Sequence, residues 1–123
     1  MAKYVEGFVL VVPKAKRAEY RKLAKQASEI WKQFGAIDYV EARLDDEKPQ
    51  HITFTFPKMT KAKEDEEVWF SYITYESKAA RNKINKQVIS YWEEKYTKED
   101  MDKGMPFDMK RFAQGGFKIE VEG

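Results

Sequence analysis

The amino-acid sequence predicts one α+β domain whose elements follow the order strand, helix, strand, strand, helix, strand. Two segments carry apolar residues at helical spacing along one stripe. Four segments rich in β-branched and aromatic residues stand before, between and after them. Right-handed crossovers then place both helices on one face of a four-stranded antiparallel sheet. This βαββαβ order is the ferredoxin-like plan, and the length of 123 residues predicts a single domain, 1–123.

The first half of the chain is predicted to form a strand, a helix and a second strand. Tyr4–Val12 is apolar at every position from 8 to 12, which is typical of a strand buried on both faces. Lys14–Phe34 has helical spacing, and Gly35 is expected to follow it as a left-handed cap. Ala36–Leu44 is the second predicted strand.

Between the two halves, Ile52–Phe56 alternates threonine with apolar residues and is predicted to be a short extra strand. The residues 58–67 are expected to form a charged loop. Val68–Tyr75 is the strongest strand pattern in the chain, because it is almost entirely β-branched and aromatic.

The second helix is expected over Lys78–Tyr96, with Ser77 as its N-cap. Lys98–Lys103 is expected to add one turn that ends at Gly104. The last strand is predicted over Arg111–Val121.

This plan leaves one face of the sheet without helices. Alternation along the strands assigns Val9, Val11, Ser71, Ile73 and Tyr75 to the helix-covered face. The opposite face is then expected to carry Glu6, Phe8, Leu10, Tyr39, Glu41, Arg43, Val68, Phe70 and Tyr72. Because so apolar a face needs cover, we expect a homodimer through it, packed as a dimeric α/β barrel. A bound ligand and stacked nucleotide bases are the alternatives.

The composition excludes several classes of protein. Lys and Arg number 23 against 21 Asp and Glu, a net charge of +2 that argues against a nucleic-acid binder. There is no cysteine, so disulfides and thiol chemistry are absent. No apolar run is long enough to span a bilayer, and the first residues do not resemble a signal peptide. A cytoplasmic location without membrane association is the resulting expectation.

The best candidates for chemistry are two carboxylates on the predicted open face, Glu6 and Glu41. On an apolar surface their pKa values are expected to rise, which suits a general base. Arg43 beside them, with Tyr39 and Tyr72, is expected to bind or orient a ligand. An ion pair between two subunits across the barrel is the alternative explanation.

A second candidate lies in the unusual stretch 105–111. Lys110 and Arg111 can receive an anion, and Asp108 can accept backbone hydrogen bonds. The alternative is structural: Pro106 and Phe107 anchor a loop while Asp108 forms an Asx turn or pairs with Arg111.

Metal, cofactor and RNA sites find little support. His51 is the only histidine and no thiolate accompanies it, so we expect no metal, no haem and no bound cofactor. Phe70 and Tyr72 match the aromatic spacing of RNA-recognition motifs, but Val68-Trp69 stands where those motifs need a basic residue and a glycine.

Several blocks in order along the chain resemble one known family. They are the opening 3–9 with Val12-Pro13, the stretches 34–36 and 66–73, Ser77-Lys78 with Arg81, Met105-Pro106-Phe107-Asp108, and Lys110-Arg111 with Gly115-Gly116-Phe117. This pattern resembles the YbaA-like bacterial proteins of unknown function. The resemblance implies a dimeric α/β-barrel relative, in a superfamily that includes cofactor-free oxygenases, haem-degrading enzymes and small isomerases. It implies no catalytic residues.

Three functional hypotheses follow. The first is a dimer that binds or transforms a small apolar or aromatic metabolite without metal or cofactor. Its site would combine Glu6 and Glu41 with the ligand-binding residues Tyr39, Arg43, Phe70, Tyr72, Asp108 and Arg111. The second is a structural or regulatory dimer without chemistry, and the third is an RNA-binding module.

Overall fold

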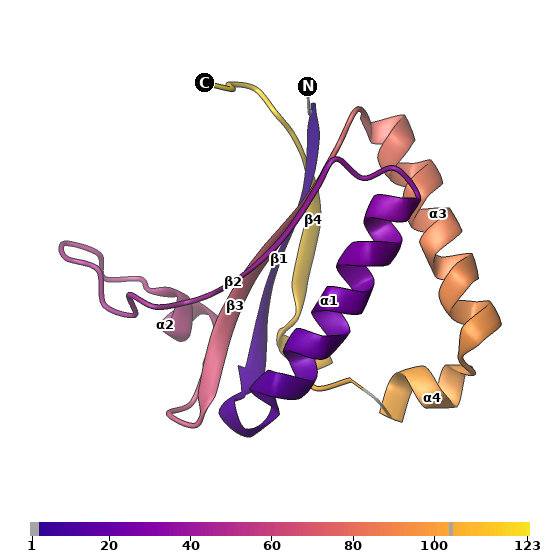
Figure 1. Cartoon of the computed structure of the whole chain (residues 1–123). Helices are drawn as coiled ribbons and strands as arrows, with labels where there is room; N and C mark the ends of the chain where they lie inside the picture. Colours follow the sequence, from indigo (N-terminus) through magenta and orange to yellow (C-terminus); the bar gives the residue numbers. More distant parts are fainter. Residues whose placement is uncertain (1–2, 104) are drawn as a thin grey trace.

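The computed structural model describes residues 3–103 and 105–123. Its sheet has the strand order β2-β3-β1-β4, and each neighbouring pair is antiparallel. The strands are β1 (Tyr4–Pro13), β2 (Asp38–Arg43), β3 (Glu66–Tyr75) and β4 (Ala113–Lys118). The helices α1 (Arg17–Gln33) and α3 (Lys78–Lys95) cover one face (Figure 1). The α+β, βαββαβ plan predicted from the sequence is confirmed.

Short elements complete the chain. They are α2 (Phe56–Thr60), α4 (Lys98–Lys103) and two 3-10 turns, η1 (Lys14–Lys16) and η2 (Met109–Arg111). The helix α4 lies near the end of α3 on the helix-covered side of the sheet (Figure 1). The expected cap at Gly104 lies outside the described residues.

The predicted helix boundaries rest on two local signals that the structure shows. Gly35 has a φ of 116°, the left-handed conformation that ends α1 at little steric cost for a glycine. At the start of α3, the Ser77 hydroxyl accepts a hydrogen bond from the amide of Ala80 at 3.0 Å. The chain therefore leaves α1 and enters α3 where the sequence indicates.

The prediction for the faces of β1 is wrong. Leu10 packs with Tyr20 of α1, and Glu6 contacts α3, so these alternating residues face the helices. Val9 and Val11 consequently point to the opposite face. Because positions 8–12 are all apolar, alternation carries no information on which set faces the helices.

The prediction for β2 is also wrong by one residue. Tyr39, Glu41 and Arg43 lie opposite Ile73, Ser71 and Trp69 of β3, all on the helix-covered face. Because these three residues are polar, the sequence favoured the face without helices. The structure places them instead in the cavity and the groove beside α1. For β3 the prediction is confirmed, since Ile73 and Tyr75 pack in the core beneath the helices.

The predicted extra strand over Ile52–Phe56 does not form, and the helix α2 begins at Phe56 and extends into the segment that was predicted to be a charged loop. The Thr55 hydroxyl accepts a hydrogen bond from the amide of Lys58, and Pro57 stands in the first turn of α2. This helix lies on the face opposite α1 and α3 (Figure 1). Part of the face expected to be open is therefore covered, and Val11 and Val68 on it are buried.

Two clusters of buried side chains form the core under the helices. One gathers around Ile73, Tyr75 and Val88, and the other around Leu10, Tyr20 and Trp69. Between 3 and 103 and between 105 and 123, none of the helices combines the length and apolar character that crossing a bilayer requires.

Candidate functional site

A cavity of about 420 Å³ lies between the helix-covered face of the sheet and the helices α1, α3 and α4. Most of its lining is aromatic or aliphatic. The lining residues are Phe8, Tyr20, Leu23, Ala24, Gln26, Ala27, Trp31, Tyr39, Glu41, Ser71, Ile73, Trp92, Tyr96, Asp100, Met105, Phe107 and Phe112. Its size suits a small organic ligand.

Glu41 is the polar centre of this cavity. The Tyr20 hydroxyl donates a hydrogen bond to one carboxylate oxygen at 2.8 Å, and the Tyr39 hydroxyl donates to the other at 2.8 Å. Tyr20 comes from α1, whereas Tyr39 and Glu41 alternate along β2, so the three groups join helix and strand. We call them the Tyr20–Glu41–Tyr39 cluster.

Burial raises the pKa of Glu41, although the hydrogen bonds from Tyr20, Tyr39 and Ser71 oppose the rise. Burial and the neighbouring carboxylate also raise the pKa values of both tyrosines. The phenols therefore stay protonated as donors at neutral pH. Of the three groups, Glu41 is the one whose pKa is raised from the acidic range towards neutrality, the direction that suits a proton acceptor.

Glu6, the other predicted carboxylate, has a structural environment. Arg81 donates to one of its oxygens at 2.7 Å, and the amide nitrogen of Asn85 donates to the other at 2.8 Å. Asn85 in turn accepts hydrogen bonds from Trp31 Nε1 at 3.0 Å and from the Tyr75 hydroxyl at 2.9 Å. Glu6 does not line the cavity, so the predicted pairing of Glu6 with Glu41 in one site is not observed.

Arg43 lies in a second, more open groove, of about 800 Å³, along the outer side of α1. Its basic lining consists of Arg17, Arg21, Lys22, Lys25 and Arg43. Glu67 pairs with Arg17 at 2.6 Å and lies 4.0 Å from Arg43. Tyr39, Glu41 and Ala24 line both spaces, so the Tyr20–Glu41–Tyr39 cluster lies between the apolar cavity and the basic groove.

Phe70 and Tyr72 lie on the opposite face of the sheet, as predicted, and their ring centroids are 6.1 Å apart. They belong neither to the cavity nor to the basic groove. A single site containing Glu41 together with Phe70 or Tyr72 is therefore excluded by the sheet itself.

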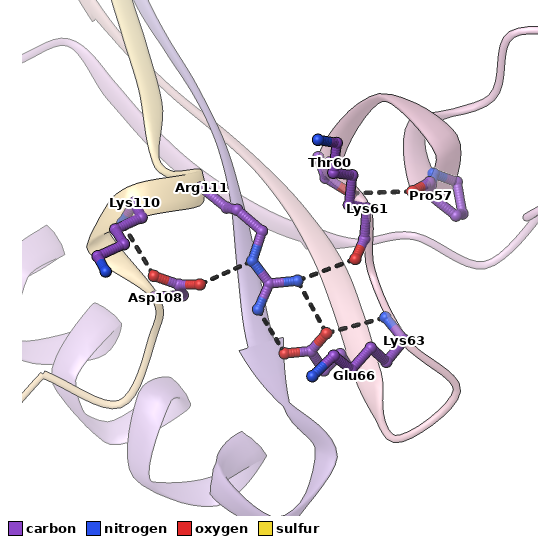
Figure 2. A network of polar contacts seen from close by, with 8 residues as sticks. All are labelled: Pro57, Thr60, Lys61, Lys63, Glu66, Asp108, Lys110 and Arg111. Carbon is purple, nitrogen blue, oxygen red and sulfur yellow. Dashed lines mark hydrogen bonds and ion pairs between the residues drawn. The ribbon is translucent and has the colours of Figure 1, made fainter.

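Asp108 and Arg111 belong to a polar network that links the turn before β4 to the start of β3 (Figure 2). Asp108 accepts from the amide of Lys110 and from Arg111 Nε at 2.7 Å. Arg111 also donates to both oxygens of Glu66, at 2.9 and 2.6 Å, and to the carbonyl of Lys61. These are the contacts of the structural alternative, and the buried Pro106 anchors the same loop.

Arg111 lowers the pKa of Glu66 from 4.5 to about 2. Since the folded value lies below the unfolded one, the pair stabilises the fold above about pH 4.5, and this contribution is lost as the pH falls towards 2. The network thus fastens the start of β3 to the turn before β4.

The sequence assigned several cavity residues to an ordinary core stripe. Tyr20 and Trp31 of the first predicted helix and Trp92 of the second belong to the apolar stripes whose spacing predicts an ordinary core. They do pack in or against the core, and each also lines the cavity. One signal could have indicated this, because a buried tyrosine hydroxyl needs a hydrogen-bond partner and the partner of Tyr20 is Glu41. Phe107 and Phe112 also reach the cavity, with stacked rings 5.3 Å apart.

Comparison with known proteins gives a family but no activity. Residues 3–109 match the model described as "Protein of unknown function (DUF1428)". The uncharacterised protein YbaA of Escherichia coli K12 is 40% identical over 120 residues, which cover 98% of each chain. YbaA of Shigella flexneri gives the same values.

A Bacillus cereus crystal structure described as a candidate antibiotic biosynthesis monooxygenase aligns with 100% of this chain and 98% of its own. Its sequence identity is 13% and the TM-score is 0.49, a similarity too distant to indicate an activity. The family match and the YbaA relatives both extend over most of the chain, and the chain therefore belongs to the DUF1428 family.

Proposed function

We propose that this protein binds a small, largely aromatic molecule in the cavity beneath α1 and α3, with Glu41 as its hydrogen-bond and proton acceptor. One observation carries the proposal: a carboxylate with a raised pKa stands in an apolar cavity of about 420 Å³. Cavities of this size with few polar groups are typical of small-molecule sites.

The walls favour a flat, apolar ligand. Trp31 and Tyr39 have ring centroids 5.9 Å apart, and Phe8 and Phe112 are separated by the same distance. Aromatic rings pack well on such walls through stacked or edge-on contacts. Most of the ligand surface would therefore contact apolar side chains, and its polar group would meet Glu41.

Glu41 can also serve in proton transfer. Two phenols hold its carboxylate in place, and burial brings its pKa closer to neutrality. A fixed carboxylate of this kind can take a proton from a bound molecule without metal or cofactor. Acid–base chemistry on the ligand is therefore the reaction class that we propose if the protein is an enzyme.

Tryptophol, a neutral indole alcohol, provides the test of cavity binding. We expect it to bind with a dissociation constant on the order of 0.1–1 mM, as suits a ligand of this size. Replacing Ala27, which lines the cavity, by phenylalanine fills the space and weakens binding by about tenfold or more. Isothermal titration calorimetry measures both values.

Ala18→Phe is the matched control, because Ala18 lies on the same helix and lines the outer groove instead. It should leave tryptophol binding unchanged. No binding to the wild-type protein, or equal binding to the Ala27→Phe variant, contradicts the proposed function.

We further propose that the protein is a homodimer through the face of the sheet that carries Phe70. This face and the segment before β3 expose several large apolar side chains, namely Ile52, Phe54, Phe56, Met59, Phe70 and Phe117. The segment projects from the sheet on the side away from α1 and α3 (Figure 1). A second copy would bury both sets at once in a symmetric contact.

Sedimentation velocity tests the dimer. The wild-type protein should have twice the mass of one chain, and Phe70→Lys should reduce it to a monomer by placing a charge in the contact. Ile89→Lys is the control, because Ile89 is also an exposed large apolar residue but lies on α3. A monomeric wild-type protein, or a dimeric Phe70→Lys variant, contradicts this assignment.

A further inference from the structure

The charges around the cavity are distributed unevenly. The chain has 23 Lys and Arg residues, but within the described part of the structure none of them, nor His51, lines the cavity. The charged lining residues are Glu41 inside and Asp100 of α4, which is exposed. Five basic side chains line instead the groove on the outer side of the Tyr20–Glu41–Tyr39 cluster.

Resting on the proposed function, we infer that the cavity selects ligands that carry a protonated amine and rejects those that carry a carboxylate. Glu41 supplies the counter-charge, and the aromatic walls supply rings whose faces attract cations. An organic anion would meet Glu41 in an apolar space without a compensating positive charge.

Glu41 has the capacity to accept a further donor. A carboxylate offers about four acceptor positions. The two tyrosine hydroxyls occupy one on each oxygen and Ser71 is a third donor, which leaves capacity for one more. Both phenols donate, so the cluster presents acceptor capacity rather than donors to a ligand. An ammonium group has three N–H donors and no acceptor, which matches this arrangement.

Within the described parts of the chain no salt bridge joins a basic side chain to Glu41, and its burial disfavours the charged form. A cationic ligand would replace the solvation that the carboxylate has lost, so the interaction is stronger here than on the surface. The five basic side chains of the outer groove do not oppose this. Arg17 and Arg43 lie against Glu67, and Arg21, Lys22 and Lys25 are exposed to solvent.

Three indole compounds of similar size test the inference: tryptamine, tryptophol and indole-3-propionate, which are cationic, neutral and anionic at about pH 7.5. Calorimetry should show tryptamine binding about tenfold or more tightly than tryptophol, with indole-3-propionate the weakest. In Glu41→Gln the advantage of tryptamine over tryptophol should fall to about threefold or less.

Glu29→Gln is the control, since Glu29 is an exposed residue of the same helix as Tyr20 and should leave the order unchanged. Tryptamine binding no tighter than tryptophol overturns the inference but leaves the proposed function standing. The inference is also overturned if indole-3-propionate binds most tightly, or if tryptamine keeps its full advantage over tryptophol in Glu41→Gln. Failure of all three compounds to bind overturns both the inference and the proposed function.

Discussion

Replacing Arg81 by methionine should lower the free energy of unfolding by about 3–5 kcal/mol. Arg81 contacts Glu6 at 2.7 Å, and the Glu6 side chain is only 4% exposed. Without the guanidinium, a buried carboxylate keeps one donor, the amide of Asn85. Urea denaturation followed by circular dichroism measures the loss.

The double variant Glu6→Gln with Arg81→Met separates charge from packing. Because it removes the unpaired carboxylate, it should recover at least half of the stability that Arg81→Met loses. Arg21→Met, at an exposed position of α1, should change stability by about 0.5 kcal/mol or less. A double variant as unstable as Arg81→Met would show that the arginine acts through its packing on Tyr4, whose ring it covers at 5.1 Å.

Replacing Leu10 by alanine should cost about 2–5 kcal/mol. Leu10 is 1% exposed and packs against Tyr20 and Trp69 beneath α1, so the truncation leaves a void in the second core cluster. The same denaturation experiment gives this value.

Val9→Ala, at the adjacent position on the opposite face, is the matched control and should cost about 1 kcal/mol. Both substitutions lower the strand propensity of β1, so their difference reports on burial. The two variants are compared at one protein concentration, so that any association contributes equally. A larger loss for Val9→Ala would contradict the register of β1.

These two experiments concern the feature that sequence patterns predicted least well. The helices could be predicted from the helical spacing of apolar residues and from the caps at Gly35 and Ser77, because these signals are local in the sequence. The face of β1 depends on what packs above it. Glu6 looked like an open-face residue, and only the contacts with Arg81 and Asn85, more than seventy residues away in the chain, explain its burial.

Only part of the candidate site could be predicted, because it too depends on contacts between residues that are distant in the sequence. Glu41 and Tyr39 were selected as a possible site from their residue types, and the structure places them together in the cavity. Tyr20, which completes the cluster, lay in a helical stripe that looked like ordinary core. Phe70 and Tyr72 are separated from them because a shift of one residue in the register of β2 moves Tyr39 and Glu41 to the other face of the sheet. Glu6 and Arg43 share the face of Glu41 but lie outside the cavity, since Glu6 pairs with Arg81 and Arg43 lines the outer groove.

The cavity lowers the stability of this fold below the value that a filled core would give. Ala24 and Ala27 line the cavity from α1, where leucine would be nearly as good a helix former and would fill apolar space. Empty apolar volume lowers stability, and filling it is a common route to a more stable protein. With alanine at both positions this space is not filled by the chain itself. A ligand that occupies the cavity would supply the missing contacts and would therefore raise the melting temperature.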